Sequence, residues 1–333
     1  MKSALFKRQP RDKTCHPFLS IIVLIASLLT LPALNACKTL AIDTTSSPSP
    51  IGQIWDTQAQ RVVSQETLLQ RAAEARYVLL GEVHDNEEHH RIQASILKAL
   101  IAKNVGPTLA MEQFDIEHQA AIDNSLKAAD VNANAVAEAG RFDRNGWDWP
   151  FYEPIIVAAL EGKAPIAAIN LSRSASRKFM NEGIQALGNA RIAELALNAV
   201  WNETRNETLR REIIDGHCGS VPDGLLPKLL AAQRARDATM ADIMITRGTA
   251  NAVVATLGLG HARKDIGAPI YLAKRMPAAS VLSLGLIEVD PNNDQVLDTS
   301  LKDLALRFDY VWFTSMAARK DPCKEFSLPT PRS

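Results

Sequence analysis

The 333-residue sequence lacks several motifs that mark common classes of enzyme. No Gly-x-Ser-x-Gly segment occurs, so a serine hydrolase would have no nucleophile elbow. His89 and His90 do not form a His-Glu-x-x-His segment, which leaves an ordinary zinc protease unsupported. Gly258 and Gly260 open a loop in which Arg263 stands where a dinucleotide-binding loop needs its third glycine. These absences narrow the enzyme classes that the chain can represent.

An excess of charge is also lacking, because 37 lysines and arginines balance 37 aspartates and glutamates. Residues 1–36 hold five of these basic residues and one acid, so a chain cut after residue 36 has 32 basic and 36 acidic residues, a net charge of −4. Nucleic-acid binding requires a basic surface, so nucleic acid is not expected as a partner.

The N-terminus has the build of a secretory signal, with a basic stretch followed by an uninterrupted apolar run at residues 18–31. The run is shorter than the roughly 20 residues that a membrane-spanning helix needs. It leads to Leu34-Asn35-Ala36-Cys37, which resembles the lipobox of bacterial lipoproteins. We therefore predict a lipoprotein signal peptide at residues 1–36 and lipidation at Cys37. The alternative is an ordinary signal peptide with a chance cysteine.

The predicted mature chain begins with a polar tether at residues 37–52, and the folded domain then occupies residues 53–330. A diacylated cysteine supplies two-chain anchoring, which makes the membrane a partner. Lys38 follows the cysteine, whereas an aspartate there would resemble an inner-membrane retention signal. The expected location is the outer membrane, with the lipid-anchored domain facing the periplasm.

Two cysteines, Cys218 and Cys323, remain after the signal and the lipidation site are set aside. Export to an oxidising compartment favours a disulfide between them. The alternative is two buried thiols.

Short apolar runs alternate with helical stretches, which predicts an α/β fold with a mainly parallel sheet flanked by helices. Five strands are expected at residues 77–80, 108–111, 165–169, 252–257 and 280–284, with a sixth at 309–313. Apolar periodicity predicts a helix over about 87–103. Residues of about 174–250 contain too much helix for one crossover, so we expect an additional helical layer over the sheet.

Polar residues follow the predicted strands at once, and the carboxyl ends of parallel strands are where ligands bind. The main candidates for one site at that edge are Glu82, His84, Glu112 and His261, with Asn170, Arg173 and Arg263 beside them. Gly81 to His84 and Gly258 to His261 repeat the pattern Gly-x-x-His, in which glycine permits a tight turn off the strand. The alternatives are structural hydrogen bonding by the histidines and helix capping by Glu82.

Other residues are weaker candidates for a haem or metal site. His89 borders the apolar face of the helix at 87–103, whereas His90 points elsewhere, and either can be a surface histidine. His217 offers an iron ligand or is a turn residue. Tyr152 offers a phenolate, an accepted haem ligand, or packs in the core. The cluster at residues 147–152 offers a flat aromatic wall or simply begins a helix.

The segment at residues 77–90, Tyr-Val-Leu-Leu-Gly-Glu-Val-His-Asp-Asn-Glu-Glu-His-His, resembles the opening motif of the ChaN family of haem-binding, iron-regulated lipoproteins. The paired Gly-x-x-His motifs are similar to those of the wider superfamily that includes Tiki, TraB and the erythromycin esterases. Residues 217–222 and 260–269 also resemble ChaN, and the likeness runs over about 75–315. The resemblance implies an α/β core with an added helical part, haem as cofactor and a role in iron acquisition.

Two functions follow from these patterns. The first is a lipoprotein that binds haem non-covalently, since no Cys-x-x-Cys-His segment is present. Its candidate partners are a second copy of the chain and an outer-membrane haem receptor. The second is a peptidase or esterase in which Glu82, His84 and His261, with Glu112, activate water directly or through a divalent metal.

Overall fold

The computed structural model describes residues 49–248, 251–290, 297–320 and 322–325. The predicted signal peptide, Cys37 and the predicted tether up to residue 48 lie outside the described residues. Within the described part of the chain, no helix is both long and apolar enough to cross a membrane.

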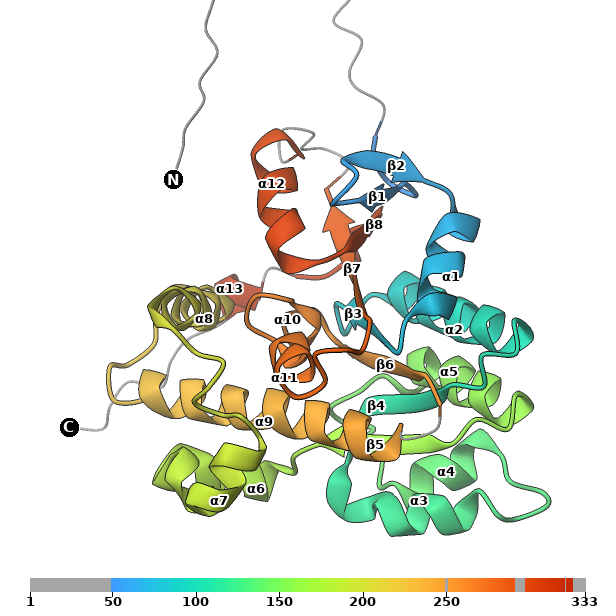
Figure 1. Ribbon diagram of the computed structural model, residues 1–333, viewed down its shortest axis with the longest axis horizontal. Coiled ribbons are helices and arrows are strands. Elements are labelled where there is room, and N and C mark those ends of the chain that lie inside the picture. Colours follow the sequence, from blue (N-terminus) through green and yellow to red (C-terminus); the bar gives the residue numbers. More distant parts are fainter. Residues whose placement is uncertain (1–48, 249–250, 291–296, 321, 326–333) are drawn as a thin grey trace, which may run out of the picture. The chain divides into compact units, whose positions relative to one another are not determined.

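The described residues form an eight-stranded sheet in the order β2-β1-β8-β7-β3-β6-β4-β5 (Figure 1). Neighbouring strands from β8 to β5 pair in parallel. All six strands predicted from the apolar runs are present: β3 (Tyr77–Glu82), β4 (Thr108–Asp115), β5 (Ile166–Asn170), β6 (Val253–Gly258), β7 (Val281–Val289) and β8 (Tyr310–Ser315). The predicted α/β fold with a mainly parallel sheet is confirmed.

Two short strands at one edge of the sheet were not predicted. They are β1 (Ile54–Asp56) and β2 (Arg61–Val63), which pair with each other in antiparallel fashion. The strand β1 also pairs antiparallel with β8. Each has only three residues, so neither produces an apolar run that marks a strand in the sequence.

Helices cover both faces of the sheet. The helices are α1 (Gln65–Glu74), α2 (Glu87–Ala102), α3 (Gln119–Ser125), α4 (Ala133–Ala139), α5 (Trp149–Glu161), α6 (Arg173–Glu182), α7 (Gly188–Glu194), α8 (Glu203–Gly216), α9 (Leu226–Arg247), α10 (Leu259–Ala262), α11 (Ala268–Arg275), α12 (Leu297–Arg307) and α13 (Pro322–Glu325), with the 3-10 turns η1 (Ile116–His118) and η2 (Ile184–Leu187). Leu80 packs in one core with α1, α2 and α5, and Leu79 packs in a second core with α7, α9 and α11. Successive residues of a strand point to opposite faces of the sheet. Because helices pack on both faces here, the residues pointing to each face must be apolar, and the strands are continuous apolar runs.

The helix predicted over about 87–103 is present as α2. It begins after Asn86, whose side chain accepts a hydrogen bond from the Glu88 backbone N–H at 3.0 Å. Asn86 is therefore the residue that caps this helix. Glu82 does not cap α2, so the alternative role of helix capping is wrong for Glu82.

The region of about 174–250 forms the expected helical layer, comprising α6, η2, α7, α8 and α9. The 22-residue helix α9 packs on the sheet through Ala238, Met240, Ala241 and Met244. In turn, α6 and α8 pack on α9. This layer therefore lies beside the carboxyl ends of the central strands.

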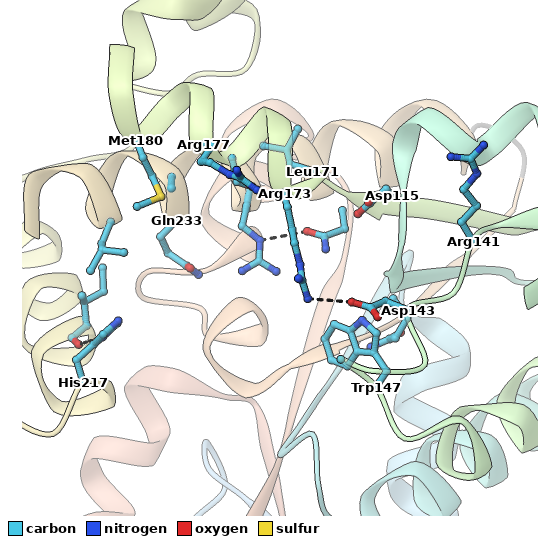
Figure 2. Close-up of a pocket in the computed structure, with 18 residues that line it drawn as sticks. Asp115, Arg141, Asp143, Trp147, Leu171, Arg173, Arg177, Met180, His217 and Gln233 are labelled. Carbon is cyan, nitrogen blue, oxygen red and sulfur yellow. Dashed lines mark hydrogen bonds and ion pairs between the residues drawn. The ribbon is translucent and has the colours of Figure 1, made fainter. Parts of the chain in front are cut away.

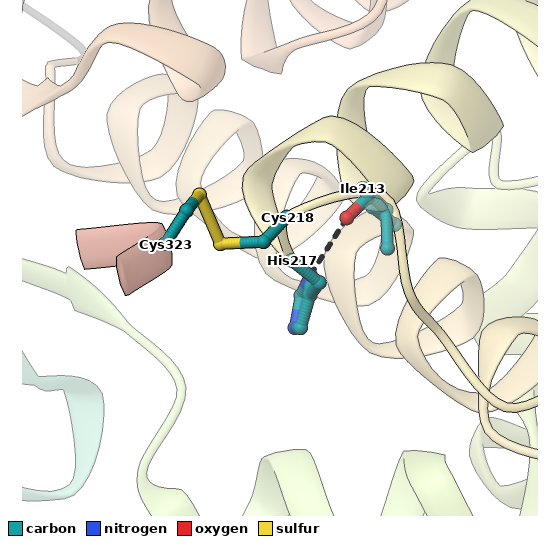
Figure 3. The surroundings of a disulfide bond; sticks show 4 residues. All are labelled: Ile213, His217, Cys218 and Cys323. Atoms are coloured by element: carbon teal, nitrogen blue, oxygen red, sulfur yellow. Dashed lines mark hydrogen bonds between the residues drawn. A yellow bond between two sulfur atoms is a disulfide. The ribbon is translucent and has the colours of Figure 1, made fainter. Parts of the chain in front are cut away.

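A disulfide joins Cys218, just after α8, to Cys323 in α13, 105 positions further along the sequence (Figure 3). The predicted pairing is confirmed, and the alternative of two buried thiols is wrong. The bond fixes the C-terminal segment to the helical layer.

Candidate functional site

The two Gly-x-x-His motifs lie side by side because β3 and β6 are neighbours in the sheet. Their parallel pairing places Gly81 beside Leu257 and Glu82 beside Gly258. Both chains then turn away from the sheet at the same edge.

Glu82 and His84 form a pair at the end of β3. The Glu82 carboxylate is buried, and its Oε1 lies 2.6 Å from Nδ1 of His84, whose side chain is 50% exposed. Burial lowers the pKa of His84, but the hydrogen bond and charge of Glu82, with the charge of Glu112, outweigh it and raise the pKa to about 9. His84 therefore carries a positive charge at neutral pH, and its ring meets Trp147 edge-on at 4.7 Å between centroids.

Glu112 is the second buried carboxylate of the site. Its Oε2 accepts the Gly258 backbone N–H at 2.7 Å, and its Oε1 accepts a hydrogen bond from Arg236 at 2.6 Å. The His261 Nε2 lies 3.5 Å from the same Oε1. Burial raises the pKa of Glu112, but His261, Arg236 and the Gly258 N–H together lower it to about 2. Glu112 is thus an anion at neutral pH.

His261 is enclosed between two acids. Its Nδ1 lies 2.6 Å from Oδ1 of Asp237 on α9, on the side of the ring away from Glu112. Burial raises the pKa of Asp237 more than the charge and hydrogen bond of His261 lower it. A carboxylate behind an imidazole in this way fixes the tautomer and the orientation of the ring.

Gly258 is where the two halves of the site meet. A Cβ atom at this position would lie 2.8 Å from Cε1 of His84 and 3.6 Å from Oε2 of Glu112. The close approach of His84 to this backbone therefore requires glycine.

The structure brings Glu82, His84, Glu112 and His261 together at one edge, and their role in binding a ligand stays a prediction.

His89 and His90 are both buried and make hydrogen bonds inside the fold, and a part for them in binding a ligand stays a prediction. His89 is buried, accepts the Val83 N–H at Nδ1 (2.9 Å) and lies 2.7 Å from the Thr314 hydroxyl through Nε2. His90 is buried too, with its Nε2 3.1 Å from the His84 carbonyl oxygen. The expectation that His90 points away from the apolar side is wrong, because its ring packs against Phe151 and Tyr152.

The remaining candidates lie in different surroundings. Asn170 accepts a hydrogen bond from Arg236 at 3.1 Å and Arg173 pairs with Asp143 at 2.8 Å, both beside the site. Arg263 does not join them, because its buried guanidinium pairs with Asp265 and Glu212.

Tyr152 is buried and directs its hydroxyl to Oε1 of Glu82 at 3.3 Å, which fits the core-packing alternative. Tyr77, Tyr271 and Tyr310, the other tyrosines of the chain, are buried as well. In this structure, therefore, none of the four tyrosines exposes its phenol at the surface of the site.

Two adjoining pockets open over this edge of the sheet. The larger, of about 540 Å³, lies between β4, β5, α6, α9 and the loop before α5, and its lining includes Arg141, Arg173, Arg177, Arg236 and Trp147 (Figure 2). The smaller, of about 270 Å³, is lined by His84, Asp237 and His261 among others. Ile213, His217 and Gln233 line both pockets. We call the two together the strand-end groove.

His217 reaches the groove from the end of α8. Its Nδ1 donates to the Ile213 carbonyl oxygen at 2.7 Å, so a ring proton lies on Nδ1 (Figure 3). It is the only histidine in the described residues that borders both pockets.

Sequence reasoning missed the contributions of α9. Gln233, Arg236 and Asp237 face the site from this helix. The sequence did contain a sign of these contributions. Gln233 and Asp237 are four residues apart, so they lie on one side of the helix, among buried alanines.

No group of three or more histidine, cysteine, aspartate or glutamate side chains in the described ranges is placed to hold a metal ion. The divalent-metal alternative therefore has no support in this geometry.

Comparison with protein families matches residues 68–272 to the family described as haem-binding uptake, Tiki superfamily, ChaN. Among solved structures, the chain is similar to ChaN of Campylobacter jejuni, solved with cofacial haem, at 27% identity and a TM-score of 0.64, over 78% of this chain and 95% of that chain. It is also similar to the type III effector HopBA1, at 15% identity and a TM-score of 0.41, over 75% and 92% of the two chains. A mutant of the erythromycin esterase EreC in its open conformation gives 12% identity and a TM-score of 0.41, over 72% and 77%. No curated protein matches the chain.

Proposed function

Since the chain belongs to the ChaN family of haem-binding uptake proteins, within the Tiki superfamily, we propose that it binds haem in the strand-end groove. The observation that carries the proposal is the chemistry of the groove, which suits a flat apolar ring with two carboxylates. Trp147, Leu171 and Leu229 supply apolar surface, and four arginines line the same pocket, two of them paired with acids. The larger pocket, at about 540 Å³, lies within the range of about 300–1,000 Å³ that is typical of small-molecule sites.

Imidazole is the haem-ligand type that the groove offers, because the tyrosines are buried. His84 and His217 both line the smaller pocket, and each has Nδ1 held by an oxygen, from Glu82 and Ile213 respectively. His84 is a cation at neutral pH, so it must release the proton on Nε2 before it can bind iron. Such an oxygen orients the ring of a metal-binding histidine. His261 is less suited, because acids lie at both of its ring nitrogens.

The finer parts of the proposal concern location and biological role. Lipidation at Cys37 anchors the protein to the outer membrane facing the periplasm, where it takes part in iron and haem acquisition. A second copy of the chain and an outer-membrane haem receptor are its proposed partners. The family and the cofacial haem in the Campylobacter jejuni relative support the haem-related part.

A Cys37→Ala variant tests the anchor. It should lose labelling by a fatty-acid probe and move to the soluble periplasmic fraction, whereas a Lys38→Ala variant should stay with the membrane. Equal membrane retention of the Cys37→Ala variant would refute lipidation.

A haem titration followed by Soret absorbance tests the binding site. His84→Ala and His261→Ala should each weaken haem binding, and the double variant should lose less than the sum of the two because both changes affect one connected site. His118→Ala is the matched control, since His118 lies on η1 and lines neither pocket. Additive losses, or binding untouched by either change, would leave these histidines structural.

A hydrolase is the second candidate, and the pairing of His261 with Asp237 favours it. A carboxylate that orients an imidazole is the arrangement of a general base. In that case peptide or ester cleavage should disappear in His261→Ala and in Asp237→Asn, and haem binding should be weak and non-saturable. Saturable haem binding without any cleavage would reject this candidate.

A further inference from the structure

The larger pocket contains two arginines that the rest of the site does not neutralise. Arg141 follows α4 and Arg177 lies on α6, and both line the pocket; in the view of Figure 2 they lie on opposite sides of the pair formed by Arg173 and Asp143. Both are exposed, and neither makes an ion pair with an acid among the described residues.

The other two arginines of the pocket are already engaged. Arg173 pairs with Asp143, and Arg236 pairs with Glu112. Asp115 is the one lining acid left, and its pKa is raised first by burial and then by the charge of Glu117. The pocket therefore keeps the positive charge of Arg141 and Arg177 beside apolar lining that includes Leu171 and Met180.

Guanidinium groups bind carboxylates through two parallel N–H···O hydrogen bonds, which gives the contact both strength and direction. Two such groups on separate elements offer one guanidinium to each of two carboxylates. We propose that Arg141 and Arg177 form a carboxylate-binding subsite that holds the two propionates of haem and so sets its orientation in the groove. This inference rests on the proposed haem-binding function.

The subsite makes the groove selective for dianionic tetrapyrroles. The propionate edge lies in the larger pocket, at Arg141 and Arg177, and the ring extends toward the wall that both pockets share at His217. A haem whose propionates are esterified keeps the ring and the iron but presents no carboxylate. It should therefore bind more weakly than haem itself.

The experiment compares ferric haem with haem dimethyl ester in the same detergent buffer, by Soret titration of the full mature chain. The unchanged protein should prefer haem, and Arg141→Ala/Arg177→Ala should weaken haem binding by about tenfold, as expected for two partly exposed ion pairs. The same variant should bind the ester as the unchanged protein does. Arg141→Lys/Arg177→Lys keeps the charge and should restore only part of the preference.

Arg210→Ala is the matched control, because it removes one exposed arginine of α8 that lines neither pocket. It should leave haem affinity and the preference for haem unchanged, and circular dichroism should show all variants folded. Three outcomes would overturn the subsite. They are equal affinity of the unchanged protein for haem and for the ester, full haem affinity in Arg141→Ala/Arg177→Ala, and a loss of haem affinity in Arg210→Ala as large as that in the double alanine variant. Absence of saturable haem binding by the unchanged protein would instead reject the proposed function.

Discussion

His89 should make the protein sensitive to mild acid. Its Nδ1 accepts the Val83 N–H, so this nitrogen cannot carry a proton without losing that hydrogen bond. Nε2 then carries the ring proton and donates it to the Thr314 hydroxyl. Burial first, and then the charges of His90 and Arg319, lower the pKa of His89 from 6.5 to about 3. The folded protein therefore holds His89 neutral, whereas the unfolded chain protonates it.

The sign of the effect follows from these two pKa values. Between pH 6.5 and 3 the unfolded chain binds more protons at His89, so the stability that the neutral ring supports is complete above pH 6.5 and is lost as the pH falls toward 3. One pKa unit corresponds to about 1.4 kcal/mol, so His89 alone should account for roughly 2 kcal/mol of the loss between pH 7 and pH 5.

The variant His89→Asn keeps a side-chain oxygen near the Val83 N–H but cannot be protonated. At pH 7 it should be less stable by about 1–3 kcal/mol, because the Thr314 contact is lost and a small cavity remains. Its further loss on moving to pH 5 should be smaller than that of the unchanged protein by roughly 2 kcal/mol.

Urea unfolding followed by far-ultraviolet circular dichroism at the two pH values measures both quantities. His118→Asn, the same substitution on η1, serves as the control. If the unchanged protein and His89→Asn lose equal stability between pH 7 and pH 5, His89 is not held neutral and the reasoning is refuted.

Two further predictions concern the groove. Gly258→Ala should displace the ring of His84 and lower the pKa of His84 from about 9 by about one unit or more, measured by NMR titration. Gly260→Ala is the control, because a Cβ at this position meets nothing within 4 Å, and it should leave the His84 pKa unchanged. Equal His84 pKa values in the two variants would contradict the contact between His84 and Gly258. Replacing Cys218 and Cys323 by serine should lower the free energy of unfolding by up to about 4.7 kcal/mol, the chain-entropy value for a loop of about 100 residues, and an unchanged urea midpoint would contradict this.

The parallel core of the sheet could be predicted from the sequence because buried strands are continuous apolar runs. Residues 77–80 and 252–257 show this directly, and their adjacency in the sheet brings the two Gly-x-x-His motifs together. The edge strands β1 and β2 escaped prediction because their pairing, with each other and with β8, rather than their own apolar character, makes them strands.

The strand-end residues of the site could be predicted, but their partners could not. Topology alone places Glu82 and Glu112 at one edge of a parallel sheet. Arg236 reaches Glu112 from 124 residues further along the chain, and only the packing of α9 on the sheet decides that contact. The burial of His90 was missed for a similar reason, because the aromatic rings that cover it come from α5.

The disulfide also links the C-terminal segment to the groove, because Cys218 adjoins His217, which lines both pockets. Cys218 leaves the ribosome 105 residues before Cys323, and β8, which holds β1 in the sheet, is also made near the end of synthesis. A chain stopped before residue 323 would contain both Gly-x-x-His motifs and the whole helical layer, yet the Cys218 thiol beside His217 would lack the partner that it has in the folded chain. Closing the bond next to the groove therefore requires the C-terminal segment that carries Cys323.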